Sequence, residues 1–148
     1  MAKTETERDS KMVLLTTFFV GDSLCALDAS SVQEVIRIDT LTRIRNAPEQ
    51  VAGVINLRGR IVTLLDLGII LGFGPSTVTK ESRVFIIEDR NEFLGLLVDK
   101  VGEVTEMQPD RIDSLPVNMP AARARCFRGV YRSGGNVIAL LNADEVLN

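Results

Sequence analysis

The chain has 148 residues, 45% of them hydrophobic and 25% charged, which is the size and composition of one ordinary globular domain. Its 17 basic and 20 acidic residues give a net charge of −3, without the basic excess that binding to a phosphate backbone requires, so we expect no nucleic-acid partner. The sequence contains no histidine, which excludes a histidine general base, a histidine metal ligand and a phosphorylated histidine.

The N-terminal segment is polar, of mixed charge, and lacks the apolar stretch of a secretory signal. We therefore predict a flexible tail over residues 1–11 and a single domain over residues 12–148, in a cytoplasmic protein. The most apolar stretch, Ile61–Thr79, is interrupted by Asp66, three glycines and one proline, so direct membrane insertion is not expected.

Short β-type segments follow one another at spacings near ten residues, which indicates an all-β barrel or sandwich. The predicted strands are Met12–Val20, Leu24–Asp28, Leu41–Arg45, Val54–Leu57, Ile61–Asp66, Arg83–Glu88, Phe93–Val98, Glu103–Met107, Phe127–Arg132 and Val137–Leu141. Turn residues such as Gly21-Asp22 and Arg58-Gly59 join several of these strands into hairpins.

Helical signals are few and short. Ser31 and Glu34 have the spacing of a capping box, which predicts one or two helical turns around Val32 and Val35. Leu67–Leu71 and Ala143–Leu147 are the other two predicted helices. Between these, residues 72–82 are rich in glycine, proline, serine and threonine, which predicts a connecting loop near the midpoint of the chain.

An internal repeat divides the sequence into two halves of about seventy residues. The apolar pattern and glycines of residues 53–66 recur 76 positions later, in residues 129–142, and Val32, Glu34 and Val35 recur 69 positions later as Val101, Glu103 and Val104. The different offsets require an insertion in the second copy, which we place within Pro109–Arg125. Either the two halves pack on each other as equivalent units, or the pattern is only what hairpins generally look like.

No group of residues predicts catalysis, a cofactor or a metal ion, so no enzyme activity is expected. Cys25 and Cys126 lie far apart in apolar segments and are interpreted as buried structural thiols. The sequence has 13 arginines and 4 lysines, a ratio that suits protein interfaces but that genomic base composition explains equally well. Arg58 is more informative, because a hairpin tip leaves its guanidinium free to meet a partner.

The motifs resemble one known family, the CheW-like coupling proteins of bacterial and archaeal chemotaxis. The resemblance is strongest over Val32–Arg37 and Val51–Leu67, continues through the hairpin Phe127–Leu141, and covers about residues 12 to 148. It implies an all-β fold of two intertwined five-stranded SH3-like barrels with a few short helices. It also implies a non-catalytic adaptor, without cofactors, that links the cytoplasmic tips of chemoreceptors to the regulatory domain of the histidine kinase CheA. Such an adaptor is cytoplasmic and is recruited to receptor arrays at the membrane.

The resemblance marks Arg58, Glu34, Val32 and Asn56 as receptor-contacting residues. Structural alternatives stay open for three of them: Val32 as a residue that packs under the first predicted helix, Asn56 as the residue that holds the turn, and Glu34 as a helix cap. Two further functions also stay open, namely coupling in a related pathway such as surface motility, and a small-molecule-binding β protein or enzyme.

Overall fold

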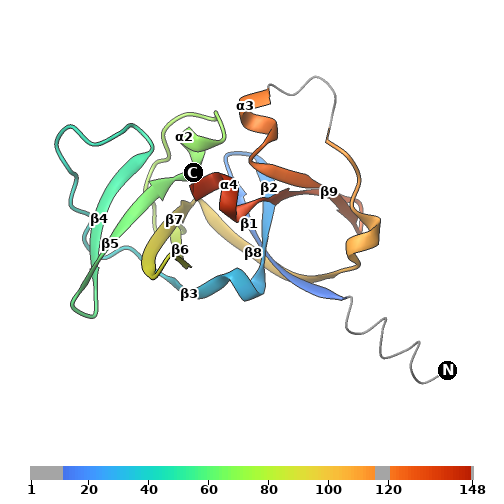
Figure 1. The fold of residues 1–148 in the computed structure, drawn as a ribbon, viewed down its shortest axis with the longest axis horizontal. Coiled ribbons are helices and arrows are strands. Elements are labelled where there is room, and N and C mark those ends of the chain that lie inside the picture. The colour runs from blue at the N-terminus through green and yellow to red at the C-terminus, as the bar shows by residue number, and fades with distance from the viewer. Residues whose placement is uncertain (1–11, 116–120, 148) are drawn as a thin grey trace.

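The computed structural model describes residues 12–115 and 121–147, so the predicted tail at residues 1–11 lies outside the described residues. The described strands form two five-stranded sheets that lie side by side (Figure 1). Sheet A contains β1 (Val13–Val20), β2 (Ser23–Asp28), β8 (Lys100–Met107), β9 (Phe127–Ser133) and β10 (Asn136–Leu141). Sheet B contains β3 (Val32–Ile36), β4 (Val51–Leu57), β5 (Arg60–Asp66), β6 (Arg83–Asp89) and β7 (Glu92–Val98).

The two sheets have the same internal order, and each takes strands from both halves of the chain. Sheet A runs β8-β1-β2-β10-β9 and sheet B runs β3-β6-β7-β5-β4, so β1 to β5 correspond in order to β6 to β10. The first-half hairpin β1–β2 pairs with second-half strands, and the second-half hairpin β6–β7 pairs with first-half strands. The predicted repeat is therefore confirmed, and its halves exchange hairpins rather than merely packing together.

The strand register repeats with the same offsets as the sequence. Val35 faces Phe85 in sheet B, and Val104 faces Thr16 in sheet A. The hairpins β4–β5 and β9–β10 pair equivalent residues from the turn up to Gly53 and Gly129. Each hairpin then has a register shift at the end that lies away from its turn. A register slip of one residue would move every side chain to the other face of a strand. Because the registers agree, equivalent side chains in the two halves lie on equivalent faces of their sheets.

A single bridge closes each sheet toward a barrel. The chain that leaves β3 returns at Thr42 to pair with Val54 on the opposite edge strand, and the chain that leaves β8 returns at Asp113 to pair with Val130. At both bridges a glycine, Gly53 or Gly129, allows the close approach, because an added Cβ would lie 2.4 or 2.5 Å from the carbonyl oxygen of Thr42 or Asp113. The predicted pair of intertwined five-stranded barrels is confirmed.

Two sequence predictions of local structure are wrong. The predicted strand Leu41–Arg45 makes only the Thr42 bridge, because the following residues are exposed and turn away at Asn46, where φ is +64°. The helical turns predicted from Ser31 and Glu34 are instead the short 3₁₀ turn η1 (Ala29–Ser31) followed at once by β3. Pairing with β6 outweighs the local capping signal there, and β-branched residues favour that pairing.

Three of the remaining short helices lie between strands, and the fourth follows the last strand. They are α2 (Leu67–Ile70), η2 (Pro109–Arg111), α3 (Ala121–Ala124) and α4 (Ala143–Leu147), so the helices predicted near residues 67 and 143 are confirmed. The buried Asp66 caps α2, since its Oδ1 accepts hydrogen bonds from Gly68 N and Ile69 N. The same carboxylate accepts hydrogen bonds from Ser76 N and Oγ, which fixes the predicted loop against α2.

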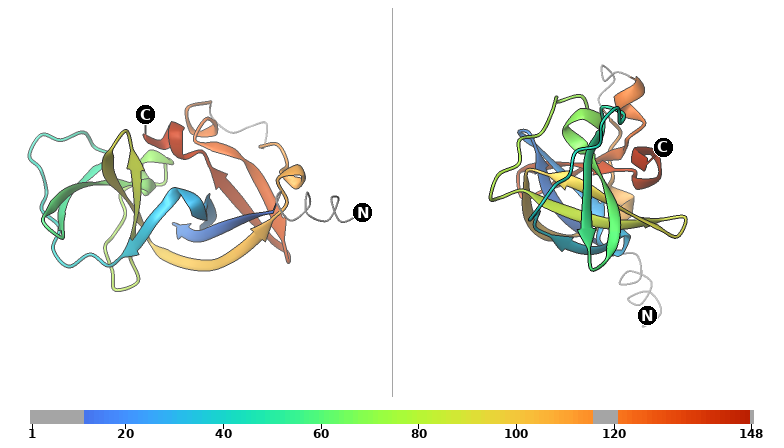
Figure 2. Two further views of the ribbon diagram at one scale, coloured as in Figure 1. Left: turned by 60° about the horizontal axis from the view of Figure 1, so that its bottom comes forward. Right: turned by 90° about the vertical axis from the view of Figure 1, so that its left-hand side faces the viewer.

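Each sheet has its own core, and a third core lies between the sheets. Leu15, Ala26, Met107, Tyr131, Ile138 and Leu140 form the core of sheet A; Ile55, Val62, Leu64, Val84, Ile86 and Leu97 form that of sheet B. The shared core combines residues of β1 and β2 with residues of β6 and β7, and includes side chains of α2 and α4. At its centre the rings of Phe18 and Phe85 meet edge to face, with centroids 5.0 Å apart. In Figure 2, α4 (red) lies where the two sheets meet.

The predicted burial of both cysteines is confirmed. Cys25 and Cys126 are reduced thiols in the shared core. Burial raises the pKa of the Cys25 thiol to about 12, and burial is also the main reason why the pKa of Cys126 is raised.

Alanine at Gly53 or Gly129 should lower the free energy of unfolding by about 2–4 kcal/mol, because the new Cβ would press on a bridge carbonyl. Urea denaturation measures the loss. Gly134→Ala is the matched control, because φ is +55° there and no atom lies within 4 Å of the added Cβ, so it should cost only about 1 kcal/mol. Equal losses at all three positions would contradict the role assigned to the bridges.

The native thiols should react with Ellman's reagent at pH 8 at least about a hundredfold more slowly than the denatured thiols, because both are buried and protonated. A pKa near 12 leaves roughly one Cys25 in ten thousand as thiolate at pH 8. A Cys126→Ser variant assigns any remaining reaction to one residue. Rapid labelling of native Cys25 would show that the shared core opens readily.

Candidate functional site

The β4–β5 hairpin ends in a two-residue turn that presents Arg58. Arg58 and Gly59 have φ values of +50° and +84°, the pattern of a type I′ turn. Asn56 Oδ1 accepts a hydrogen bond from Gly59 N at 2.9 Å. The predicted turn-holding role of Asn56 is therefore confirmed, and it offsets part of the strain of a non-glycine residue at positive φ.

Glu34 reaches this turn from the opposite edge of sheet B. It lies at a register shift of the edge strand β3, between Val32 and the pair Glu34–Ile86. An Arg58 Nη2 proton is donated to Glu34 Oε1, forming an ion pair that we call the clasp. The hydrogen bond and the charge of Glu34 raise the pKa of the Arg58 guanidinium. The Arg58 side chain is 71% exposed and that of Glu34 is 32% exposed, so the clasp positions the tip more than it stabilises the fold.

A hollow of about 590 Å³ lies between the two edges of sheet B. It is lined by Ile36, Arg37, Asp39, Thr40, Ile55, Asn56 and Leu57. Two large apolar side chains are exposed on the strands that carry the clasp, Val35 at 44% and Ile61 at 68%. Apolar surface beside fixed charges is the composition that protein interfaces favour, since the apolar part supplies area and the charges supply orientation.

Three of the four predicted site residues are brought together: Arg58, Glu34 and Asn56. Val32 is apart from them, since it is half-buried and packs against the shared core. Val32 does pack, but as part of β3 on the shared core and not under a helix, and the capping interpretation of Glu34 is wrong. Ile61, which the sequence did not single out, lies directly opposite Asn56, so alternation along the hairpin places the two side chains on the same face.

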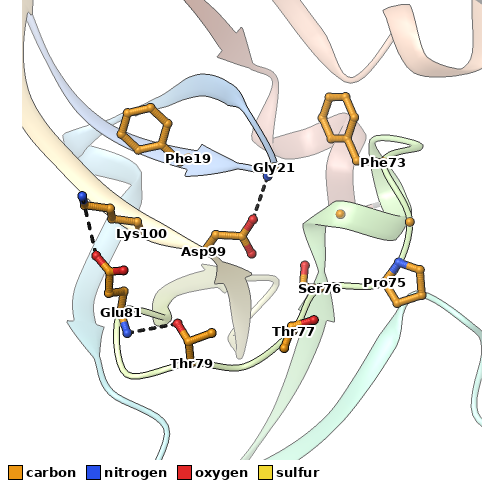
Figure 3. A pocket seen from close by; sticks show the side chains of 12 residues that line it. Phe19, Gly21, Phe73, Pro75, Ser76, Thr77, Thr79, Glu81, Asp99 and Lys100 are labelled. Atoms are coloured by element: carbon orange, nitrogen blue, oxygen red, sulfur yellow. Dashed lines mark hydrogen bonds and ion pairs between the residues drawn. The ribbon is translucent and has the colours of Figure 1, made fainter.

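A second hollow, of about 560 Å³, lies where the β1–β2 turn meets the start of β8 and the loop after α2 (Figure 3). Its charged groups are engaged: Asp99 Oδ2 accepts a hydrogen bond from Gly21 N at 2.7 Å, and Lys100 pairs with Glu81 at 3.6 Å. These contacts hold three connecting segments together. They supply no pair of nucleophile and base.

Within residues 12–115 and 121–147, no group of three or more cysteine, aspartate or glutamate residues is placed to hold a metal ion. No helix in this part of the chain is long and apolar enough to cross a bilayer. The described part of the chain is thus an all-β protein of two interlocked five-stranded barrels with a clasped turn at its surface.

Comparison with known proteins identifies the family. A model described as the CheW-like domain matches residues 14–148, so the chain belongs to the CheW-like domain family. It is 30% identical over 133 residues to the chemotaxis protein CheW of Rhizobium meliloti (strain 1021), covering 89% of this chain and 85% of that protein. It is 22% identical over 146 residues to the chemotaxis protein CheW of Helicobacter pylori, covering 99% and 88%. The crystal structure of the scaffolding protein TtCheW from Thermoanaerobacter tengcongensis has a TM-score of 0.83 at 28% identity, covering 92% and 88%.

Asn56→Ala should lower the free energy of unfolding by about 0.5–1 kcal/mol, because the Gly59 amide loses its side-chain acceptor at the turn. Asn56→Asp keeps an oxygen in the same place and should retain most of that stability. Urea denaturation of both variants measures the difference, and an equal loss in both would contradict the turn-holding role.

Proposed function

We propose that the chain is a non-catalytic chemotaxis adaptor that joins chemoreceptor tips to the histidine kinase CheA. Membership of the CheW-like family supports the adaptor role, since relatives carry the names chemotaxis protein CheW and scaffolding protein. Binding to the cytoplasmic tips of receptors then recruits the protein to arrays at the membrane. The regulatory domain of CheA binds a different surface of the protein, so that receptor and kinase are held at a fixed distance and orientation.

The observation that carries the receptor-binding part of this proposal is the clasp. Arg58 is held by Glu34 through one guanidinium nitrogen, and most of the Arg58 side chain remains exposed beside the sheet B hollow. An arginine with a fixed position loses little conformational entropy on binding, and arginine is enriched among the residues that dominate interface energetics. Arg58 and Glu34 thus present charge to the receptor on a preformed surface.

The other two residues have supporting roles. Asn56 fixes the turn that carries Arg58, and it shares a face with the exposed Ile61, which adds apolar area to the contact. Val32 belongs to the strand that carries Glu34 and anchors that strand on the shared core, so it acts on receptor binding through the position of Glu34. This arrangement predicts a larger effect at Arg58 than at Val32 when each is conservatively replaced.

Arg58→Ala should weaken binding of a receptor cytoplasmic fragment by at least about tenfold and leave binding of the CheA regulatory domain unchanged. Affinities are measured with purified proteins from the same organism, and circular dichroism checks the fold of each variant. Arg128→Ala, which removes an exposed arginine from sheet A, is the matched control.

Exchanging the two charges of the clasp tests whether Arg58 and Glu34 contact the receptor directly or only position the turn. Glu34→Arg combined with Arg58→Glu restores an internal ion pair, and should still fail to bind the receptor if the receptor contacts these charges directly. Recovery of binding in the exchanged protein would assign the clasp a positioning role only. If the unmodified protein binds neither the receptor nor the kinase, the proposed function fails as a whole.

A further inference from the structure

The repeat places a second glutamate where the clasp would be in sheet A. Glu103 on β8 lies 69 positions after Glu34, at a register shift of β8 that corresponds to that of β3. The turn opposite it is Gly134-Gly135, with φ values of +55° and +86°, nearly those of Arg58-Gly59. The backbone of the clasp is therefore duplicated, and its arginine is replaced by a glycine.

The second clasp position has no internal cation. The Glu103 side chain is exposed, and no ion pair or side-chain hydrogen bond joins its carboxylate to any residue in the described part of the chain. Arg132, which corresponds to Asn56, is directed elsewhere: its Nε lies 3.9 Å from Asp113 Oδ2.

An open hollow of about 470 Å³ lies at this position. It is lined by Thr17, Phe19, Leu24, Gly102, Glu103, Thr105, Ser133, Gly134, Asn136 and Ile138. In sheet B larger side chains stand at the matching positions, with Leu57, Arg58 and Arg60 in place of Ser133, Gly134 and Asn136. The guanidinium carbon of Arg60 lies 4.1 Å from the ring centre of Phe93. In sheet A the residues equivalent to Arg60 and Phe93 are Asn136 and Leu24, which cannot form such a stack. The two arginine side chains that lie at the turn of sheet B, Arg58 and Arg60, therefore have no counterpart of similar size beside Glu103 in sheet A.

We propose that this hollow is a docking site for an arginine side chain supplied by a different protein. The guanidinium pairs with Glu103 as Arg58 pairs with Glu34, and the methylene stem lies against Phe19 and Leu24. Arginine fits better than lysine, since its planar fork can pair with the carboxylate while its stem covers apolar surface. We assign the arginine to a different protein and not to a second copy of this chain. A contact between two different surfaces of identical chains would repeat from copy to copy and build a ring or a filament.

The direct test uses N-acetyl-arginine amide as the probe, with N-acetyl-citrulline amide as its neutral analogue. Titration of ¹⁵N-labelled protein should shift the amide signals of Gly102, Glu103, Ser133 and Gly134, with an affinity at least about fivefold higher for the arginine probe. Glu103→Gln should weaken that affinity at least about fivefold. Glu106→Gln, on the same strand and outside the hollow, should leave it unchanged.

Gly134→Arg supplies the missing arginine within the chain. No atom lies within 4 Å of an added Cβ at this position, and Arg58 adopts the same backbone, so the variant is expected to fold. It should abolish probe binding and should also block one protein partner, the kinase regulatory domain or the receptor fragment, while the other still binds. If Gly134→Arg does not fold, Glu103→Gln is tested against the same two partners.

Several results would overturn the inference. They are the absence of shifts at the hollow, equal binding of the citrulline probe, and equal effects of Glu103→Gln and Glu106→Gln. Self-association that Glu103→Gln abolishes would identify a second copy as the occupant and would overturn the assignment to a different protein. The probe titration requires neither receptor nor kinase, so its outcome is independent of the proposed adaptor function.

Discussion

The edge-to-face contact of Phe18 with Phe85 lies in the core on which both sheets depend. Among the described residues, each sheet has an inner core of six buried side chains, and the outer faces of the hairpins β1–β2 and β6–β7 are covered by the other sheet together with side chains of α2 and α4. Neither barrel has a core large enough to be expected to stand alone. The two surfaces that we assign to partners are therefore held at a fixed separation by the same packing that folds the protein.

We assign different roles to two nearly equivalent barrels because a few residues differ at their hairpin turns. In sheet B the turn carries Arg58 and closes on Glu34, whereas in sheet A the same backbone carries glycines and leaves Glu103 open. Both sites lie on strands and tight turns rather than on long loops, so little ordering is required when a partner binds. A duplicated scaffold can thus offer one completed and one incomplete version of the same contact.

Much of the fold was predictable because hairpins are encoded locally, by alternation of apolar residues and by turn residues such as Arg58-Gly59. The exchange of hairpins was not predictable from the residues, since either assignment of β1–β2 satisfies the same alternation. The capping signal of Ser31 and Glu34 failed because pairing with β6 determines that segment. Family resemblance named Glu34 and Arg58 separately, but their contact depends on how sheet B curls, and that depends on long-range pairing.

The order of strands along the chain also determines when each sheet can be completed. Sheet B uses residues 32–98 without interruption, whereas sheet A combines β1 and β2 with strands that follow residue 99. During synthesis on the ribosome, all strands of sheet B are therefore available to pair with one another while the β1–β2 hairpin still lacks both of its neighbours, β8 and β10. That hairpin must wait until β8 (Lys100–Met107) and β10 (Asn136–Leu141) have been synthesised, which is the situation in which nascent chains expose unpaired strand edges and require protection from aggregation.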